Sequence, residues 1–251
     1  MGKKGGSKHL KRLPAPKIWS IHRKEFKWVV KPSAGPHSLE TSLPLLLLVR
    51  EMLGLAKNRR EAKIMLSAGN VKIDGKTRRS DDYPVGIMDV VEIIPSKQTF
   101  RVFPSEHQLL LYPINEDEKA FKLCEVVNIT TVKKGQIQLH LHDGKTLLVK
   151  AGQGQSVADV YKVHDLLKIS IPDNEILAHQ NFEEGILGIV DNGKNAGILV
   201  EVAEILQRPW PSKTVVTLKD KTGKTFETIL DYVFPIGKGE PWVRIPEEIH
   251  L

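Results

Sequence analysis

Seven basic side chains fall within 21 residues of one another in the first third of the chain. They are Arg59, Arg60, Lys63, Lys72, Lys76, Arg78 and Arg79. Guanidinium and ammonium groups form charge-assisted hydrogen bonds with phosphate oxygens, and such contacts read a nucleic-acid backbone rather than its base sequence. A run of charges is often only a solvated surface, but residues 32–80 hold just four acidic residues, too few to neutralise it. The spacing therefore favours a surface that binds the backbone of folded RNA.

The remaining basic excess lies upstream of these residues. Residues 1–31 carry ten basic residues and one acidic residue, whereas residues 81–251 carry 18 basic and 25 acidic ones, within a formal net charge of +7. A polycationic block favours a polyanionic partner, because each phosphate contact releases condensed counterions. We therefore expect eight residues of the block to contact RNA: Lys3, Lys4, Lys8, Lys11, Arg12, Lys17, Arg23 and Lys24.

Residues 1–40 are predicted to form an extended arm, because glycines and prolines break any regular period. The arm also carries Trp19, Phe26 and Trp28, and a purely solvated tail rarely holds two tryptophans. We expect the arm to become ordered against RNA or protein, with Trp19 or Trp28 stacked on a base or packed beneath the body. The alternative is a flexible, solubilising tail.

A first helix is expected to begin the unit that presents the seven basic residues, residues 41–104. Thr41 or Ser42 is the predicted cap, and Pro44 stands in the first turn, where a missing N–H is tolerated. Apolar residues from Leu45 to Ala56 recur at helical spacing, which predicts one buried face.

A second helix is predicted from Asn58 to Gly69, with Glu61 placed as in a capping box. Strands follow at 71–73 and 89–94, the first of them ending in an Asp-Gly turn. Packing two helices on a small sheet would gather the basic residues at one edge.

From about residue 104 onward the pattern indicates strands, at 121–129, 136–142, 146–149, 186–190, 197–202, 213–218 and 225–230. Short strands with glycine turns suggest small barrels rather than a parallel sheet. The predicted fold is α+β and multi-domain: a helical/β module, then two mainly-β domains at 105–176 and 177–235, and a tail at 236–251.

Enzyme chemistry is not indicated. The sequence has no G-x-S-x-G, H-E-x-x-H or Walker motif, and Gly152-Gln153-Gly154 lacks a third glycine. His140 and His142 alternate along a strand at a spacing that two metal ligands can use, but no acidic or cysteine cluster completes a site. Cys124, the single cysteine, is typical of a small core residue and of a reducing compartment. We expect no cofactor, metal, small-molecule substrate or membrane partner for a soluble, intracellular protein.

The stretch NRREAKIMLSAGNVKIDGK (58–76), followed by DVVEI (89–93), resembles the S4, or alpha-L, RNA-binding module. Pseudouridine synthases and some tRNA synthetases also carry this module. Three further segments look together like the S4e family of archaeal and eukaryotic small-subunit ribosomal proteins: KKGGSKHLKRLPAPKIW (3–19), PSAGPHSLETSLPL (32–45) and FPIGKGEPWVRIP (234–246).

The resemblance implies that residues 184–202, EGILGIVDNGKNAGILVEV, belong to a KOW-type domain resembling an SH3-like barrel. In the family the loop of this hairpin contacts RNA or protein, which adds candidate site residues: Gly193, Lys194, Asn195 and Gly197. A plain structural hairpin is the alternative for this loop.

The resemblance as a whole implies a non-enzymatic, structural constituent of the small ribosomal subunit, of archaeal type and cytoplasmic. Its partners would be small-subunit rRNA and neighbouring ribosomal proteins. Two alternatives remain open from the residues alone: an RNA-modifying enzyme that uses the module to deliver its substrate, and a translation or transcription factor that binds transiently.

Overall fold

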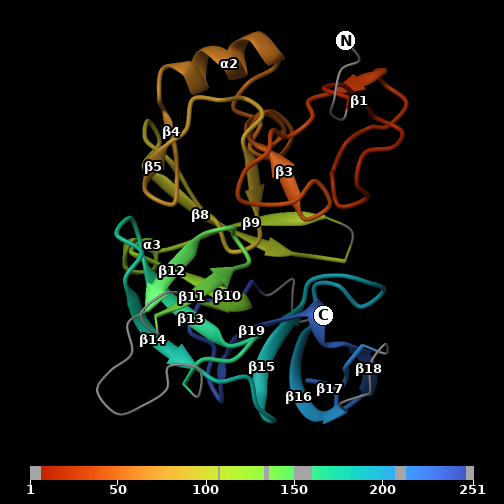
Figure 1. Ribbon diagram of the computed structural model, residues 1–251. Coiled ribbons are helices and arrows are strands. Elements are labelled where there is room, and N and C mark those ends of the chain that lie inside the picture. The colour runs from red at the N-terminus through yellow and green to blue at the C-terminus, as the bar shows by residue number, and fades with distance from the viewer. Residues whose placement is uncertain (1–6, 107, 133–135, 150–159, 207–212, 247–251) are drawn as a thin grey trace, which may run out of the picture.

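The computed structural model describes residues 7–106, 108–132, 136–149, 160–206 and 213–246. The arm and helix α2 (Arg59–Ser67) lie at one end of the molecule, and two β units lie at the other (Figure 1). A sheet that includes the strand pair β8 and β9 lies between these ends and joins them (Figure 1).

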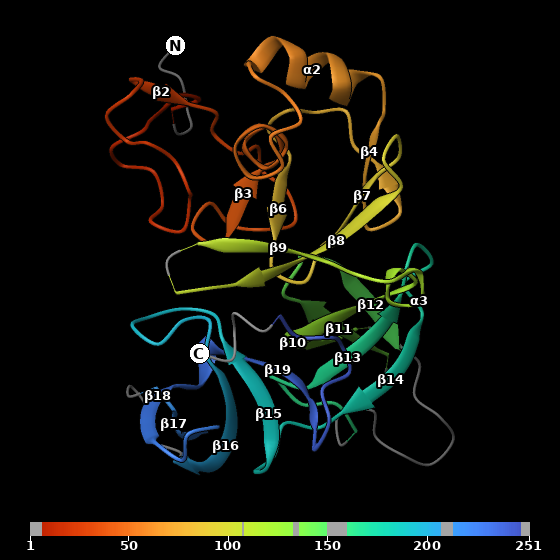
Figure 2. The ribbon, with the colours of Figure 1, turned by 180° about the vertical axis from the view of Figure 1, so that it is seen from behind.

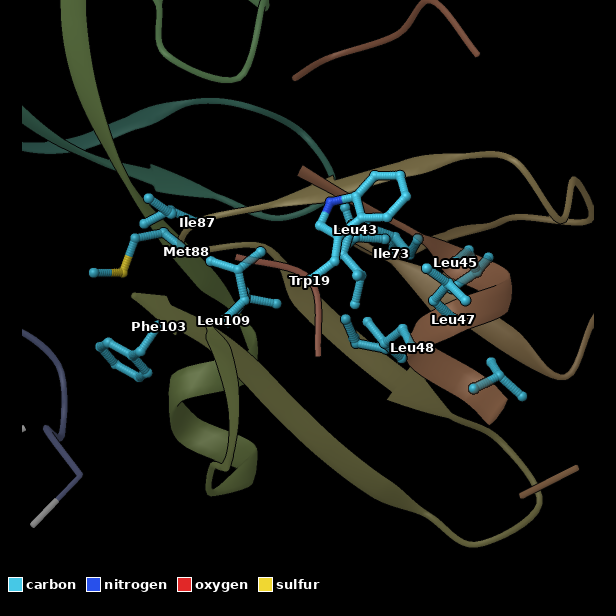
Figure 3. Close-up of a cluster of buried hydrophobic side chains, with 14 of the residues drawn as sticks. Trp19, Leu43, Leu45, Leu47, Leu48, Ile73, Ile87, Met88, Phe103 and Leu109 are labelled. Atoms are coloured by element: carbon cyan, nitrogen blue, oxygen red, sulfur yellow. The ribbon is translucent and has the colours of Figure 1, made fainter. Parts of the chain in front are cut away.

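The arm contains one regular element, an antiparallel ribbon of β1 (Leu10–Lys11) and β2 (Trp28–Val29). The loop between the two strands packs on the body through Trp19, whose indole N–H donates a hydrogen bond of 2.6 Å to the carbonyl oxygen of Ser42. Figure 3 shows Trp19 beside Leu43 within a cluster of buried apolar side chains. The arm is therefore an integral part of the fold over residues 10–29.

The first predicted helix begins later than expected and is not one regular helix. Ser42–Pro44 forms strand β3, which pairs with β6 (Pro84–Gly86), and the Ser42 hydroxyl donates to the carbonyl of Ser38 instead of capping a helix. The helical segment consists of α1 (Leu45–Leu47) and the π-helix η1 (Leu48–Met52). Residues 42–49 are all buried, so α1 has no solvent face, and the segment reaches the surface only in η1, at Arg50 and Glu51.

The second predicted helix and both predicted strands are confirmed. Helix α2 is followed by an antiparallel sheet in the order β5 (Lys76–Thr77), β4 (Val71–Ile73), β7 (Val90–Ile93), β8 (Gln98–Pro104) and β9 (Leu109–Pro113). Because β8 pairs with both β7 and β9, this sheet continues past residue 104 to Pro113.

A second antiparallel sheet follows the short helix α3 (Glu116–Lys119). Its order is β12 (Thr146–Val149), β11 (Ile137–Leu141), β10 (Phe121–Thr131), β13 (Leu166–Ser170) and β14 (Ile176–Gln180). Strand β10 pairs with β13 along its first half and with β11 along its second half, with a register shift between Val126 and Asn128. The sequence patterns predict β10, β11 and β12 but miss β13 and β14.

A third antiparallel sheet has the order β18 (Thr225–Ile229), β17 (Val215–Asp220), β16 (Leu199–Leu206), β15 (Ile186–Val190) and β19 (Val233–Lys238). The one-turn helix η3 (Leu230–Tyr232) leads from β18 to β19, which returns to pair with β15. The predicted strands at 186–190, 213–218 and 225–230 correspond to β15, β17 and β18.

Within the described residues, the buried apolar side chains form three clusters. One is confined to the second sheet and one to the third, but the largest joins the arm, the helical segment and the first sheet to Ile189, Leu199 and Phe234 of the third sheet. The module with the basic residues is thus packed directly on the last β unit.

Candidate nucleic-acid interface

Helix α2 presents three of the predicted phosphate contacts to solvent. Its first turn is fixed by Asn58, whose side-chain oxygen accepts a hydrogen bond of 3.0 Å from the backbone N–H of Glu61. Ala62 and Leu66 are buried on the inner side. This leaves an exposed basic face, called the α2 face below, of Arg59, Arg60 and Lys63.

One carboxylate lies beside the α2 face. Asp81 contacts the guanidinium of Arg59 at 3.1 Å and the ammonium of Lys63 at 3.5 Å. Both basic side chains remain more than half exposed, at 57% and 51%, so each pair contributes at most about 1 kcal/mol and exchanges readily for another anion. Arg60 has no ion pair within the described ranges.

The turn after β4 brings further cations close to α2. Gly69 ends the helix with a φ of +80°, and a Cβ added there would lie 3.7 Å from Nε of Arg79. Arg78 stacks over the ring of Tyr83 at 4.4 Å, and Lys76 is exposed. Lys72 lies 3.8 Å from Glu92 and is partly neutralised. The structure therefore places Arg79 next to the end of α2 and leaves Lys76 and Arg79 open to a ligand.

Three arm residues assigned to RNA from the sequence hold the arm together instead. Arg12 is 3% exposed and donates to the carbonyl of His22 at 2.7 Å while contacting Glu25. Arg23 donates to backbone carbonyls of the same loop, those of Arg12, Leu13, Ala15 and Pro16. Trp19 is buried and offers no face to a base, so packing beneath the body is the role it has here.

The other arm cations point to solvent. The exposed ones are Lys8, Lys11, Lys17, Lys24 and Lys27. Lys3 and Lys4 lie outside the described residues. Trp28, unlike Trp19, is 52% exposed. The arm thus has two kinds of residue: Arg12, Trp19 and Arg23 hold it together and on the body, and the lysines just named, called the outer lysines below, are exposed.

The loop between β15 and β16 is tied to the module rather than projecting freely. Gly197 has a φ of +85°, and a Cβ there would lie 2.7 Å from Cα of Ser105 in the β8–β9 connection. Gly193 and Lys194 are exposed, and Asn195 is half-buried. Gly197 therefore serves close packing between two parts of the fold, and Lys194 is the exposed cation of this loop.

A buried ionic cluster joins the first sheet to the second, and sequence reasoning missed it. The ammonium of Lys122 lies 3.0 Å from Asp74 and 3.1 Å from Asp143, and it also contacts Asp89. Lys145 contacts Asp74 at 3.1 Å and Asp143 at 3.0 Å. Asp74 and Asp143 were visible in sequence only as residues of Asp-Gly turns.

The charges of this cluster stabilise one another against burial. Burial disfavours the ammonium of Lys122, but the three carboxylates outweigh it and hold the pKa well above its usual value. Burial likewise raises the pKa of Asp143, yet Lys122, His142 and Lys145 bring it well below the usual range. The ammonium of Lys122 thus occupies the position among three carboxylates that a metal cation could otherwise occupy. No group of residues suited to a metal ion is found in the described parts of the chain.

The other candidates for chemistry are structural in this fold. Cys124 is buried, and burial raises the pKa of its thiol far above the usual value, so it is a poor nucleophile. His140 lies 3.0 Å from the Thr130 hydroxyl. His142 accepts from the backbone N–H of Glu125 and donates to the carbonyl of Ile87, the pattern of a neutral imidazole. Across the described ranges, none of the helices combines the length and hydropathy that a membrane span requires.

Comparison with protein families matches three successive parts of the chain. The RS4NT (NUC023) domain matches residues 4–40, the S4 domain matches residues 46–91, and the ribosomal family S4e matches residues 96–176. The first match covers the arm and the second covers α2 with the turn that carries Lys76 and Arg79.

Whole-chain relatives agree with these matches. The small ribosomal subunit protein eS4 of Staphylothermus marinus is 47% identical over 98% of this chain and 99% of its own. That of Methanothermobacter thermautotrophicus is 43% identical over 95% of this chain and 96% of its own. The crystal structure of the 30S ribosomal protein S4e from Thermoplasma acidophilum superposes with a TM-score of 0.66 at 30% identity, over 79% of this chain and 96% of that one. The chain belongs to the S4e family of ribosomal proteins.

Proposed function

We propose that this chain is a structural constituent of the small ribosomal subunit that binds rRNA through the α2 face and the arm. The observation that carries the proposal is the exposed set of cations on an S4 domain, with one neighbouring carboxylate, Asp81. The relatives are named as small-subunit ribosomal proteins, which supports the same location for this chain, on ribosomes in the cytoplasm. A ribosomal protein family gives no support to an enzyme.

The proposed mechanism is neutralisation of phosphates at several places at once. Lys76 in β5 and Arg79 just after it add to the α2 face. The outer lysines of the arm, Lys8, Lys11, Lys17, Lys24 and Lys27, supply further cations at the same end of the molecule (Figure 1). These contacts fix the position and orientation of folded RNA without reading its bases. The acidic-leaning second and third sheets would face solvent or neighbouring ribosomal proteins.

The proposed domains are an arm (1–40), the S4 module (41–104), a central β domain (105–176), a KOW-type SH3-like barrel (177–235) and a tail (236–251). The sheets extend three of these bounds, since β9 carries the first sheet to Pro113, β14 carries the second to Gln180 and β19 carries the third to Lys238. Support for the barrel comes from the strand order, in which β19 returns to pair with β15 at one side of a five-stranded antiparallel sheet. The proposed contact of this barrel with RNA or protein is Lys194 at the tip of the β15–β16 loop.

The stoichiometry of the chain on ribosomes tests the proposal. Small subunits washed at high salt and quantified by mass spectrometry should contain one copy of this chain per subunit, because a resident protein is held by many buried contacts. Release at moderate salt, or far fewer copies than subunits, would instead indicate a transient factor.

A further inference from the structure

A groove of about 940 Å³ lies between the arm and the helical part of the S4 module. The ribbon of β1 and β2 with the neighbouring arm residues forms one wall, and α1, η1 and the start of α2 form the other. Figures 1 and 2 show the arm and α2 at the same end of the molecule. The groove therefore lies beside the α2 face, and Arg59 belongs to both surfaces.

Two aromatic rings of the arm line the groove without being used in the core. Trp28 is 52% exposed and Phe26 is 61% exposed, whereas Trp19 is buried. A cation lies over one face of each exposed ring: the Lys27 ammonium is 5.3 Å from the centre of the Trp28 ring, and the Arg12 guanidinium is 5.1 Å from the centre of the Phe26 ring. Arg12 is buried, whereas Lys27 is exposed, so Trp28 with Lys27 is the pair that a ligand can reach. An aromatic face next to a cation is the arrangement that holds an unpaired nucleotide, with its base stacked and its phosphate neutralised.

The charge of the groove is positive. Its basic residues are Lys8, Arg12, Lys27, Lys31, Arg50 and Arg59. Arg12 is buried against Glu25 and Arg50 pairs with Glu51, so the groove's charges that stay open to a ligand are those of Lys8 and Lys27. Its carboxylates are already engaged, since Asp81 pairs with Arg59 and Lys63, and Asp82 accepts a hydrogen bond from the Ser80 hydroxyl. Lys8 and Lys27 contact no carboxylate in the described parts of the chain. An anionic ligand is therefore favoured over a neutral or cationic one.

Base stacking distinguishes between a paired and an unpaired strand. A duplex keeps its bases stacked inside the helix, so its phosphates reach cations but no base reaches an aromatic ring on a protein surface. The α2 face offers only cations beside the apolar Ile64, and it suits the backbone of folded RNA. Trp28 and Phe26 can therefore stack only with the bases of an unpaired strand.

We propose that this groove binds an unpaired segment of RNA, with one base stacked on Trp28 and the adjoining phosphates held by Lys8 and Lys27. The proposal rests on the rRNA-binding function proposed above and goes further, because it assigns single-stranded RNA to a surface separate from the α2 face. The two surfaces together would hold the junction between a folded element and the strand that leaves it.

Binding of the full chain to oligo-adenylate of about eight nucleotides tests the proposal, with a blunt RNA duplex of the same length as the second probe. Trp28→Leu should weaken binding of oligo-adenylate by about tenfold, since leucine offers no ring for a base to stack on, and should leave binding of the duplex unchanged. Trp28→Phe should retain most of the affinity. Leu177→Ala removes a similarly exposed apolar side chain from β14, outside both surfaces, and should alter neither.

Intrinsic fluorescence provides a second readout. Oligo-adenylate should quench tryptophan emission of the native chain, and the quenching should disappear in Trp28→Leu while the thermal unfolding midpoint is retained. Equal effects of Trp28→Leu on both probes, or none on oligo-adenylate, would overturn the proposal. Displacement of the oligonucleotide by poly-glutamate in a Trp28-dependent manner would overturn it in favour of an acidic protein partner. If the native chain binds neither oligo-adenylate nor small-subunit rRNA, the proposed function itself fails.

Discussion

The α2 face and the buried ionic cluster use the same kinds of residue in opposite surroundings. On α2, Arg59 and Lys63 share Asp81 at the surface, where water and salt screen the pairs. In the cluster, Lys122 is 1% exposed and lies among three carboxylates. Ion pairs therefore hold this fold together where water is excluded, and they remain available to a ligand where it is not.

Removing the charge at the centre of the cluster should have the largest effect on stability. Lys122→Ala leaves three buried carboxylates without their common partner, and the free energy of unfolding should fall by about 3–5 kcal/mol. Urea denaturation at neutral pH measures this loss. Combining Lys122→Ala with Asp89→Asn should recover part of it. A loss of unfolding free energy below about 1 kcal/mol would mean that the cluster contributes no more than exposed ion pairs do, and that it does not differ from the α2 face in this respect.

Acid should weaken the buried region in a window set by His142. Burial, assisted by the charge of Lys122, lowers the pKa of His142 to about 4 from its usual value of 6.5. Between these values the unfolded chain binds a proton at His142 and the folded chain does not, so stability is full above pH 6.5 and falls as the pH drops toward 4. The full loss from this group is about 3 kcal/mol.

Urea denaturation from pH 7 to pH 4 measures the effect of His142, and His142→Gln should reduce the slope of stability against pH in that window. His164 acts with the opposite sign, because Glu125 raises its pKa against the effect of burial. Subtracting the variant slope from the native slope removes this contribution. An unchanged slope in His142→Gln would contradict the prediction.

The α2 face should show the smallest effect on stability and a large one on RNA binding. Replacing Arg59, Arg60 and Lys63 by Ala should change the free energy of unfolding by no more than about 1 kcal/mol. The slope of log affinity for small-subunit rRNA against log salt should become shallower by up to about 0.9 for each phosphate that the variant no longer neutralises. Filter binding over a salt series measures it.

The matched control for the α2 face replaces three lysines at the β17–β18 hairpin, Lys219, Lys221 and Lys224, by Ala. This variant should bind small-subunit rRNA with the native salt slope. A variant of the α2 face that unfolds, or that keeps the native slope, would remove this helix from the RNA interface.

Features fixed by neighbouring residues were predictable from the sequence. The cap at Asn58, the end of α2 at Gly69 and the Asp-Gly turn at Asp74 depend on local hydrogen bonds and on backbone conformation. The exposure of Arg59, Arg60 and Lys63 then follows from the helical period. The family resemblance, drawn from segments between residues 3 and 93 and from residues 234–246, is confirmed by the family matches over residues 4–40, 46–91 and 96–176 and by relatives that match nearly the whole chain.

Features that depend on distant parts of the chain were not predictable. Nothing local tells Trp19 from Trp28, yet the first is bonded to Ser42 and the second faces solvent. The sequence around Arg12 does not distinguish it from the exposed cations of the arm, because its burial depends on the loop that brings Glu25 to it. The helix expected from Ser42 fails for the same reason, because its first residues pair with strand β6. The surroundings of these residues depend on which strands pair and on which side chains are buried, and neither can be predicted from a few neighbouring residues.

The position of Lys122 on β10 has a consequence for how strands find their partners. Phe121 and Leu123 flank it, and side chains along a strand alternate between faces, so a slip of one residue would bring an apolar side chain among Asp74, Asp89 and Asp143. The three carboxylates would then lose the cation that they share, and Lys145 and His37 alone would have to balance their charge away from water. The three aspartates lie in separate turns of the chain. All three turns must therefore be in their native positions before Lys122 can contact all three carboxylates. The cluster therefore favours the native register of β10, because a shifted register would bury carboxylates without Lys122, whereas apolar packing alone penalises such a shift less.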